Sequence, residues 1–245
     1  VRISTPSPAA LMPVTTSVRP TDPDAALASI RTTIGDCTRC KLHTLGRKQI
    51  VFGVGNPNAD LMFVGEAPGA DEDVQGEPFV GRAGQLLTKI IEAIGLQRSD
   101  VYIANVVKCR PPGNRDPRPE EIAACSPFLE TQLDLIAPRV VVTLGNFATK
   151  LLSGKPLGIT RVHGVEQEVV LGGNRVLLFP LFHPAAALYM PRMLEVLEAD
   201  FARLPDLIGR TPVDPATAAA PAAASDDALS FDKTAISAVG FRTLF

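Results

Sequence analysis

Hydrophobic residues in this chain of 245 residues gather in short continuous runs, which alternate with longer stretches of helical periodicity. Four of the runs predict β-strands, at residues 60–67, 101–108, 139–145 and 175–183. Their hydrophobic residues are consecutive rather than alternating with polar ones, which is typical of strands buried on both faces of a parallel sheet. The segment 165–179 also predicts a β-hairpin with its turn at residues 172–174.

The periodic stretches between these runs predict α-helices. They cover residues of about 26–35, 83–94, 119–135, 146–152 and 193–208. The third begins with Pro119, Glu120 and Glu121, and a proline with acidic residues in the first turn is typical of a helix start. Alternating strands and helices predict an α/β domain, a three-layer α/β/α sandwich around a central, mainly parallel four-stranded sheet. Ligands of such sheets bind beyond the carboxyl ends of the strands.

The composition changes at both ends of this region. Residues 1–25 are rich in proline, serine, threonine and alanine without periodicity, which predicts a disordered extension. Residues 211–245 begin as an alanine- and proline-rich linker and end in an apolar peptide. The folded domain is therefore expected at 26–210. No apolar run reaches the length of a membrane span and no secretory signal opens the chain, so we expect a cytoplasmic protein without a membrane partner.

The net charge of −2 does not by itself suggest a nucleic-acid partner. Residues 211–245 hold four acids and two bases, so the remainder balances at 22 of each. A general positive field is absent, and any contact with DNA has to come from a local patch. One basic patch is visible at 107–118, with Lys108, Arg110, Arg115 and Arg118 against a single acid. On charge alone a solvated loop is the simpler interpretation of this patch.

The segment between the first predicted strand and the following helix has an unusual charge. A phosphate-binding loop commonly occupies this position, because main-chain N–H groups and a helix N-terminus attract anions. Here the segment carries five acidic residues, Glu66, Asp71, Glu72, Asp73 and Glu77. These carboxylates would repel a pyrophosphate, so neither a P-loop nor a dinucleotide-binding loop fits. For Asp71 and Asp73 a solvated turn is an equally good interpretation.

The four cysteines, Cys37, Cys40, Cys109 and Cys125, allow three interpretations. Structural disulfides are disfavoured without any sign of secretion. A thioredoxin-like pair would follow directly after a first strand, whereas Cys37 and Cys40 follow a short predicted helix. A four-thiolate metal site uses all four residues, and either zinc or an iron–sulfur cluster satisfies that count. The irregular spacing leaves the metal open.

Four motifs, taken in order, resemble those of the family-four, thermostable-type uracil-DNA glycosylases. They are GEAPGADED at 65–73, PFVGRAG at 78–84, NVVKCRPPGNRDP at 105–117 and HPAAAL at 183–188. Together with the cysteine spacing, the resemblance covers about residues 37–200. It implies the α/β/α fold of that family, a [4Fe–4S] cluster held by the four cysteines, and hydrolysis of the N-glycosidic bond of deoxyuridine in DNA. That reaction releases uracil and leaves an abasic site in base excision repair.

The resemblance also gives the acidic loop a chemical role. As the base departs as an anion, positive charge builds on the sugar, and a nearby carboxylate stabilises it and orients or activates a water. By resemblance, Glu66 and Glu72 are the strongest candidates for this catalytic role, followed by Asp71 and Asp73. The chain lacks the aspartate that better-known uracil glycosylases place soon after the first motif glycine. The sequence therefore leaves open which acid positions the water.

By the same resemblance, five residues are expected to bind uracil. They are Gly65, Ala67, Phe79, Asn105 and His183. Phe79 would stack on the extruded base, although an isolated phenylalanine can equally belong to the core. The amide of Asn105 can donate to O4 and accept from N3–H, whereas cytosine inverts both groups. His183 would donate to the charge that develops on O2. As alternatives, Asn105 could have hydrogen-bond partners within the protein, and His183 could have only a capping role.

Candidates for contact with DNA are Lys108, Arg110, Arg115 and Leu188. Leu188 would wedge into the stack that the base has left, although a leucine at a helix start commonly belongs to the core. A related branch of the family captures uracil-DNA covalently through a histidine after the third cysteine. Residues 110–118 contain no histidine, so the resemblance implies ordinary turnover. Single-stranded and duplex DNA are both expected as substrates, because base flipping is needed only for the duplex.

Two other classes of protein compete with this interpretation. One is a non-catalytic iron–sulfur protein that binds DNA with the same pocket. The other is a zinc-stabilised nucleotide hydrolase, which needs phosphate contacts that the acidic loop does not offer. The final FRTLF, 241–245, loosely resembles the Leu-Phe endings by which repair enzymes bind the sliding clamp, and packing onto the domain is its alternative. We expect a monomer that acts in the cytoplasm in association with the nucleoid.

Overall fold

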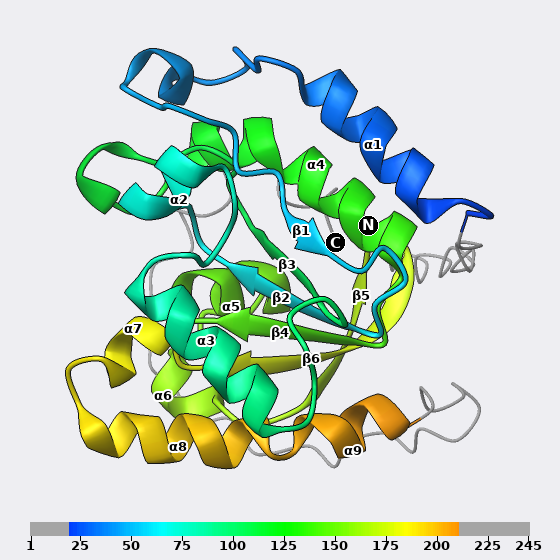
Figure 1. Ribbon diagram of the computed structural model, residues 1–245, viewed down its shortest axis with the longest axis vertical. Helices are drawn as coiled ribbons and strands as arrows, with labels where there is room; N and C mark the ends of the chain where they lie inside the picture. The colour runs from blue at the N-terminus through cyan, green and yellow to red at the C-terminus, as the bar shows by residue number, and fades with distance from the viewer. Residues whose placement is uncertain (1–19, 211–245) are drawn as a thin grey trace, which may run out of the picture.

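The computed structural model describes residues 20–210, and the structural statements below concern that part of the chain. A six-stranded sheet runs through its centre in the order β1-β3-β2-β4-β6-β5 (Figure 1). The strands are β1 Val54–Gly55, β2 Leu61–Gly65, β3 Tyr102–Asn105, β4 Val140–Leu144, β5 Gln167–Leu171 and β6 Asn174–Leu181. The four inner strands are parallel, while β1 and β5 run antiparallel to their neighbours at the two edges.

The predicted α/β class and mainly parallel sheet are confirmed, but the sheet has six strands where four were predicted. β5 is the first arm of the predicted hairpin, which turns between Leu171 and Asn174. β1 is only two residues long and gave no periodic signal. Every residue of β2 and β4 is buried, which is the reason for their unbroken hydrophobic runs.

Helices cover both faces of the sheet (Figure 1). One face packs against α1 Pro23–Ile34, α4 Pro119–Ile136 and α5 Asn146–Ser153. The opposite face packs against α3 Arg82–Ala93, α7 Pro184–Ala187, α8 Pro191–Phe201 and α9 Leu204–Gly209. β2 serves both cores, because Met62 and Val64 point into the first and Leu61 and Phe63 into the second. This arrangement is the predicted three-layer sandwich.

Shorter elements complete the described chain. They are α2 Ala70–Gln75, α6 Ile159–Val162 and single 3₁₀ turns at Lys41–Thr44 and Pro112–Asn114. The first helix begins at Pro23, capped by the side chain of Asp22, so folded structure starts before the predicted boundary at 26. The predicted extension before residue 20 and the predicted linker and peptide at 211–245 lie outside the described residues. No helix between residues 20 and 210 is long and apolar enough to span a membrane.

The four parallel strands all end at the same edge of the sheet. Gly65 at the end of β2 pairs in register with Asn105 at the end of β3, and Leu144 of β4 pairs with Leu181 of β6. The side chains that follow these strand ends therefore converge on one place. Most of the residues that the sequence singled out belong to this edge.

Candidate active site

Gly65 brings two candidate uracil-binding residues together. A Cβ atom at Gly65 would lie 2.4 Å from Oδ1 of Asn105 and 2.6 Å from Cζ of Phe79. Both distances are shorter than any real Cβ contact, so only glycine permits this approach. The amide and the aromatic ring consequently meet directly above the end of β2.

Phe79 is held in an unusual backbone conformation. Its φ of 55° lies in the left-handed region, which is uncommon for an aromatic residue and stores strain. Gly84 of α3 makes room for it, because a Cβ there would lie 1.9 Å from the carbonyl carbon of Phe79. The Phe79 ring belongs to the core beneath α3, and it also stacks on His183 with ring centroids 5.5 Å apart. Phe79 is thus a fixed wall that contacts a second candidate site residue.

Asn105 presents an unsatisfied acceptor to this place. Its side chain is 2% exposed, and Oδ1 has no hydrogen-bond partner within residues 20–210. A buried acceptor without a partner costs roughly 1–3 kcal/mol. The alternative of internal partners for this oxygen does not hold in the described chain. An N–H group of a ligand would relieve the cost.

His183 stands at the N-terminus of α7. The main-chain N–H of Ala185 donates to Nδ1 of His183 at 3.1 Å, so the proton of the neutral ring lies on Nε2. Burial lowers the pKa of His183 and outweighs the opposing effect of Glu72. Gly145 follows β4 with a φ of 94°, and its missing side chain leaves room for Cβ of His183. His183 therefore caps the helix, as its alternative role requires, and also keeps an N–H donor.

Glu66 is the half-buried carboxyl group that follows β2. Burial raises its pKa from 4.5 to about 7, and the charge of Asp116 on the basic loop adds to the rise. A carboxyl group with a pKa near 7 exchanges protons readily at neutral pH, as a general base requires. The raised pKa of Glu66 is suited to that task.

The carboxylates of Glu72 and Asp73 both accept hydrogen bonds from main-chain N–H groups of the protein. Oε1 of Glu72 accepts from the main-chain N–H groups of Val80 and Gly81, both at 2.9 Å. Oδ1 of Asp73 accepts from Lys48 N at 3.0 Å and Gln49 N at 3.4 Å, and the side chain is 2% exposed. The solvated-turn alternative is therefore wrong for Asp73. It suits Asp71, which is exposed. The contacts of Glu72 favour a positioning role for this residue over the catalytic role that was predicted.

Comparisons with known proteins agree with this geometry. The family model of the uracil-DNA glycosylase superfamily matches residues 52–204. A type-4 uracil-DNA glycosylase of Archaeoglobus fulgidus is 48% identical over 181 residues, which cover 72% of this chain and 90% of the relative. The chain belongs to the type-4 uracil-DNA glycosylases. Those of Sulfurisphaera tokodaii and Thermotoga maritima are 47% and 51% identical, over 74% and 61% of this chain and 84% and 76% of theirs.

The basic loop of this type-4 uracil-DNA glycosylase is less exposed than its sequence suggests. Lys108 is completely buried and cannot reach a phosphate, which corrects its prediction as a DNA contact. Arg115 donates to both carboxylate oxygens of the buried Glu121, at 2.8 and 2.6 Å, and these bonds lower the pKa of Glu121. Arg110 donates to Oδ1 of Asn114 at 2.7 Å and keeps part of its side chain exposed. Arg118 is exposed.

Leu188 ends α7 and is partly exposed. The two residues that follow it are more open, since Tyr189 is 77% exposed and Met190 is 53% exposed. The sequence did not single out this pair, because no helix was predicted at 184–187. Gly145 was not singled out either, since its position after a predicted strand was the only hint.

The four cysteines of the glycosylase lie in one region. Cys109 and Cys125 are buried, and Cys37 and Cys40 are partly exposed. Burial raises the pKa of Cys109 and Cys125, and each also feels the charge of Cys40, so the thiols are near one another. Nitrogen donors point at three of the sulfur atoms. Lys108 N donates to Cys125 at 3.2 Å, Arg39 to Cys37 at 3.3 Å and Arg47 to Cys109 at 3.5 Å.

Four cysteine thiols, with N–H donors beside three of their sulfur atoms, are a donor set that an iron–sulfur cluster could use. An iron–sulfur cluster spreads four thiolates around several irons, and N–H groups that donate to sulfur are the contacts that tune it. The residues present therefore fit a cluster with four cysteine ligands.

Proposed function

We propose that this protein hydrolyses the N-glycosidic bond of deoxyuridine in DNA, releasing uracil and leaving an abasic site for base excision repair. Membership of the type-4 uracil-DNA glycosylases supports this activity. The observation in the structure that carries it is the buried, unpartnered Oδ1 of Asn105, which faces Phe79 across Gly65. Such an acceptor suits the N3–H of uracil, and an amide beside an aromatic wall is what recognition of an extruded base requires.

Uracil is distinguished from cytosine at Asn105. Its Oδ1 accepts from N3–H of uracil and its NH₂ group donates to O4, while cytosine presents the reversed pattern. The Phe79 ring stacks on the base, and Gly65 and Ala67 leave their main chain close to it. A cytosine in this pocket would leave Oδ1 of Asn105 opposite another acceptor.

Bond cleavage uses His183 and Glu66. The Nε2–H of His183 donates to O2 as the departing uracil becomes an anion. Glu66 in its ionised form orients a water and takes its proton, while its charge stabilises the sugar cation. Glu72 holds the main chain at Val80 and Gly81, which positions the adjacent Phe79. His183 thus stabilises the negative charge on uracil, and Glu66 stabilises the positive charge on the sugar.

We assign a [4Fe–4S] cluster to Cys37, Cys40, Cys109 and Cys125. The type-4 family and the thiol geometry support it. When bound, the cluster ties the segment around Cys37 to the basic loop and to α4. Its role in this proposal is structural.

DNA approaches the edge of the sheet at which Glu66 and His183 lie. Arg110 and Arg115 are proposed to contact its backbone, with Arg115 anchored by Glu121. Leu188 is proposed to fill the stack from which the base has left. The enzyme is proposed to act as a monomer in the cytoplasm, near the nucleoid. Residues 241–245 are proposed to bind a partner such as the sliding clamp.

The activity is tested with a fluorescent oligonucleotide that contains one uracil. After incubation and treatment with alkali, the strand is expected to break at the uracil, and a matching thymine strand is expected to stay intact. A protein that binds the oligonucleotide but gives no alkali-labile site would refute the enzyme and support the non-catalytic alternative. A chain ending at Arg210 is expected to cleave equally well, and a large decrease in its melting temperature would show that residues 211–245 contribute to the fold.

A further inference from the structure

Lys108 has an unusual environment for a lysine. Its side chain is fully buried, and the ammonium donates to the main-chain oxygen of Asn105 at 3.0 Å and to Oε1 of Gln132 at 2.5 Å. Hydrogen bonds from a charged donor are stronger than those between neutral groups. A buried charge is costly unless hydrogen bonds compensate it, and the two bonds of this ammonium provide that compensation. The mechanism described above leaves this lysine without a task.

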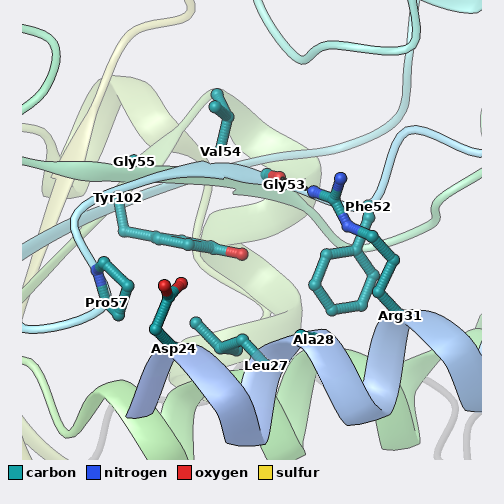
Figure 2. A pocket seen from close by; sticks show the side chains of 10 residues that line it. All are labelled: Asp24, Leu27, Ala28, Arg31, Phe52, Gly53, Val54, Gly55, Pro57 and Tyr102. Atoms are coloured by element: carbon teal, nitrogen blue, oxygen red, sulfur yellow. Dashed lines mark hydrogen bonds between the residues drawn. The ribbon is translucent and has the colours of Figure 1, made fainter. Parts of the chain in front are cut away.

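Gln132 of α4 extends the contact into a network. Its Nε2 donates to the main-chain oxygen of Phe52 at 3.0 Å and to the hydroxyl of Tyr102 at 3.2 Å. Gly53 makes room for the network, because a Cβ there would lie 2.9 Å from that hydroxyl and 3.1 Å from Nε2 of Gln132. Phe52, Gly53 and Tyr102 lie at the far end of the network and also line a pocket of about 290 Å³. Figure 2 shows these three residues around that pocket, beside α1. The ammonium of Lys108 is therefore held by Asn105 on one side and by Gln132 and its network on the other.

The same lysine lies between the pocket for the base and the cysteines. Its main-chain N–H donates to the sulfur of Cys125, also on α4, at 3.2 Å. Upstream, the N–H of Val106 donates to the oxygen of Gly65 at 2.9 Å, which continues the pairing of β2 and β3. Asn105 is consequently fixed on one side by β2 and on the other by the ammonium of Lys108.

We propose that Lys108 is a positioning residue for uracil recognition, which acts by fixing the main chain of Asn105 so that its carboxamide faces the base. This inference rests on the proposed function. Asn105 Oδ1 has no hydrogen-bond partner to set its direction, so the backbone from which it projects, together with packing against Gly65 and Phe79, determines where it points. The bond from Lys108 to the carbonyl oxygen of the same residue supplies that constraint. A misplacement of about 1 Å at a recognition group can lower a rate on the order of 100-fold.

The test compares K108M with T143V. The methionine keeps an unbranched apolar side chain but removes the donor. The control removes another buried polar contact of the sheet, between Thr143 and Thr149, which does not touch Asn105. We would measure four properties of each full-length protein. They are inhibition by free uracil, kcat and KM on a uracil oligonucleotide, the visible absorbance that reports the proposed iron–sulfur cluster, and the melting temperature.

K108M is expected to weaken inhibition by free uracil on the order of 10- to 100-fold and to lower the preference for uracil over cytosine, with the visible absorbance retained. T143V is expected to bind uracil as the unaltered protein does. Equal uracil inhibition in folded K108M, or an equal loss in T143V, would overturn the proposal. If K108M does not fold, Q132M decides, because it removes one of the two acceptors that hold the ammonium against Asn105, together with the bonds that Nε2 donates to Phe52 and Tyr102. Weaker uracil inhibition in Q132M supports the proposal, and unchanged inhibition refutes it. Absence of cleavage by the unaltered protein would instead refute the function itself.

Discussion

Replacing Glu66 by glutamine tests the general base and its pKa together. The change keeps the shape of the side chain but removes the charge and the ability to take a proton. Loss of a general base costs on the order of 10²–10⁴ in rate. In the unaltered protein kcat/KM should rise with pH and level off above about 7, because only the ionised carboxyl group is active. In E66Q this dependence should disappear.

The stability of E66Q gives a second measurement of the same pKa. A rise from 4.5 to about 7 corresponds to roughly 3 kcal/mol, and solvent at this half-buried group reduces it to about 1–2 kcal/mol. Because the folded pKa lies above the unfolded value, ionisation opposes folding, and the penalty grows between pH 4.5 and 7. E66Q should therefore be more stable than the unaltered protein above pH 7, by about 1–2 kcal/mol, and should match it near pH 4.

Single-turnover cleavage of a uracil oligonucleotide between pH 5 and 9 measures the first effect, and urea unfolding at pH 4 and pH 9 measures the second. E77Q is a suitable control, because Glu77 is an exposed acid of the same loop. A normal rate in E66Q, or an unchanged rise of its rate with pH, would refute the role of Glu66. Equal loss in E77Q would show that the charge of the loop matters rather than this carboxyl group.

Three further predictions concern the neighbouring residues. H183A should lower kcat on the order of 10²–10³ with little change in KM, because Nε2–H binds charge that develops only during cleavage, and unchanged turnover would leave His183 a helix cap. N105D should weaken uracil binding and narrow the difference between uracil and cytosine, since an ionised carboxylate only accepts; unaltered discrimination would contradict this. The purified protein should be brown with iron bound, and C125S should be colourless and have a lower melting temperature. A colourless unaltered protein with stoichiometric zinc would exclude the cluster.

The sequence was sufficient for the features that follow from strand direction. Parallel strands end at one edge, so Glu66, Asn105 and His183 could be placed together from the hydrophobic runs alone. Lys108 shows where such reasoning stops. It lies in a run of basic residues that looks exposed, but the chain turns inward beneath α4, where Gln132, 24 residues later, receives it. No local pattern encodes that partner.

The acidic residues show a similar limit. Glu72 binds the N–H groups of residues eight and nine positions later, and Asp73 binds a segment about 25 residues earlier. Neither separation belongs to a helix or strand period, so a solvated turn and a buried carboxylate looked alike in the sequence. β1 was missed for a simpler reason, because two residues are too few for a period to appear.

The charge of the loop after β2 has an explanation in these contacts. In a phosphate-binding loop, free N–H groups and a helix N-terminus receive an anion from outside. Here Gly81 is the residue that caps α3, and its N–H, like that of Val80, is already taken by Oε1 of Glu72. The protein supplies the anion itself, and the helix dipole stabilises that carboxylate. The position is thereby closed to phosphate, and Phe79, next to Val80, is fixed by the same contact. In the proposed function Glu66 faces the sugar, whose transition state is positive, so the negative charge of the loop suits this reaction and not a phosphate site.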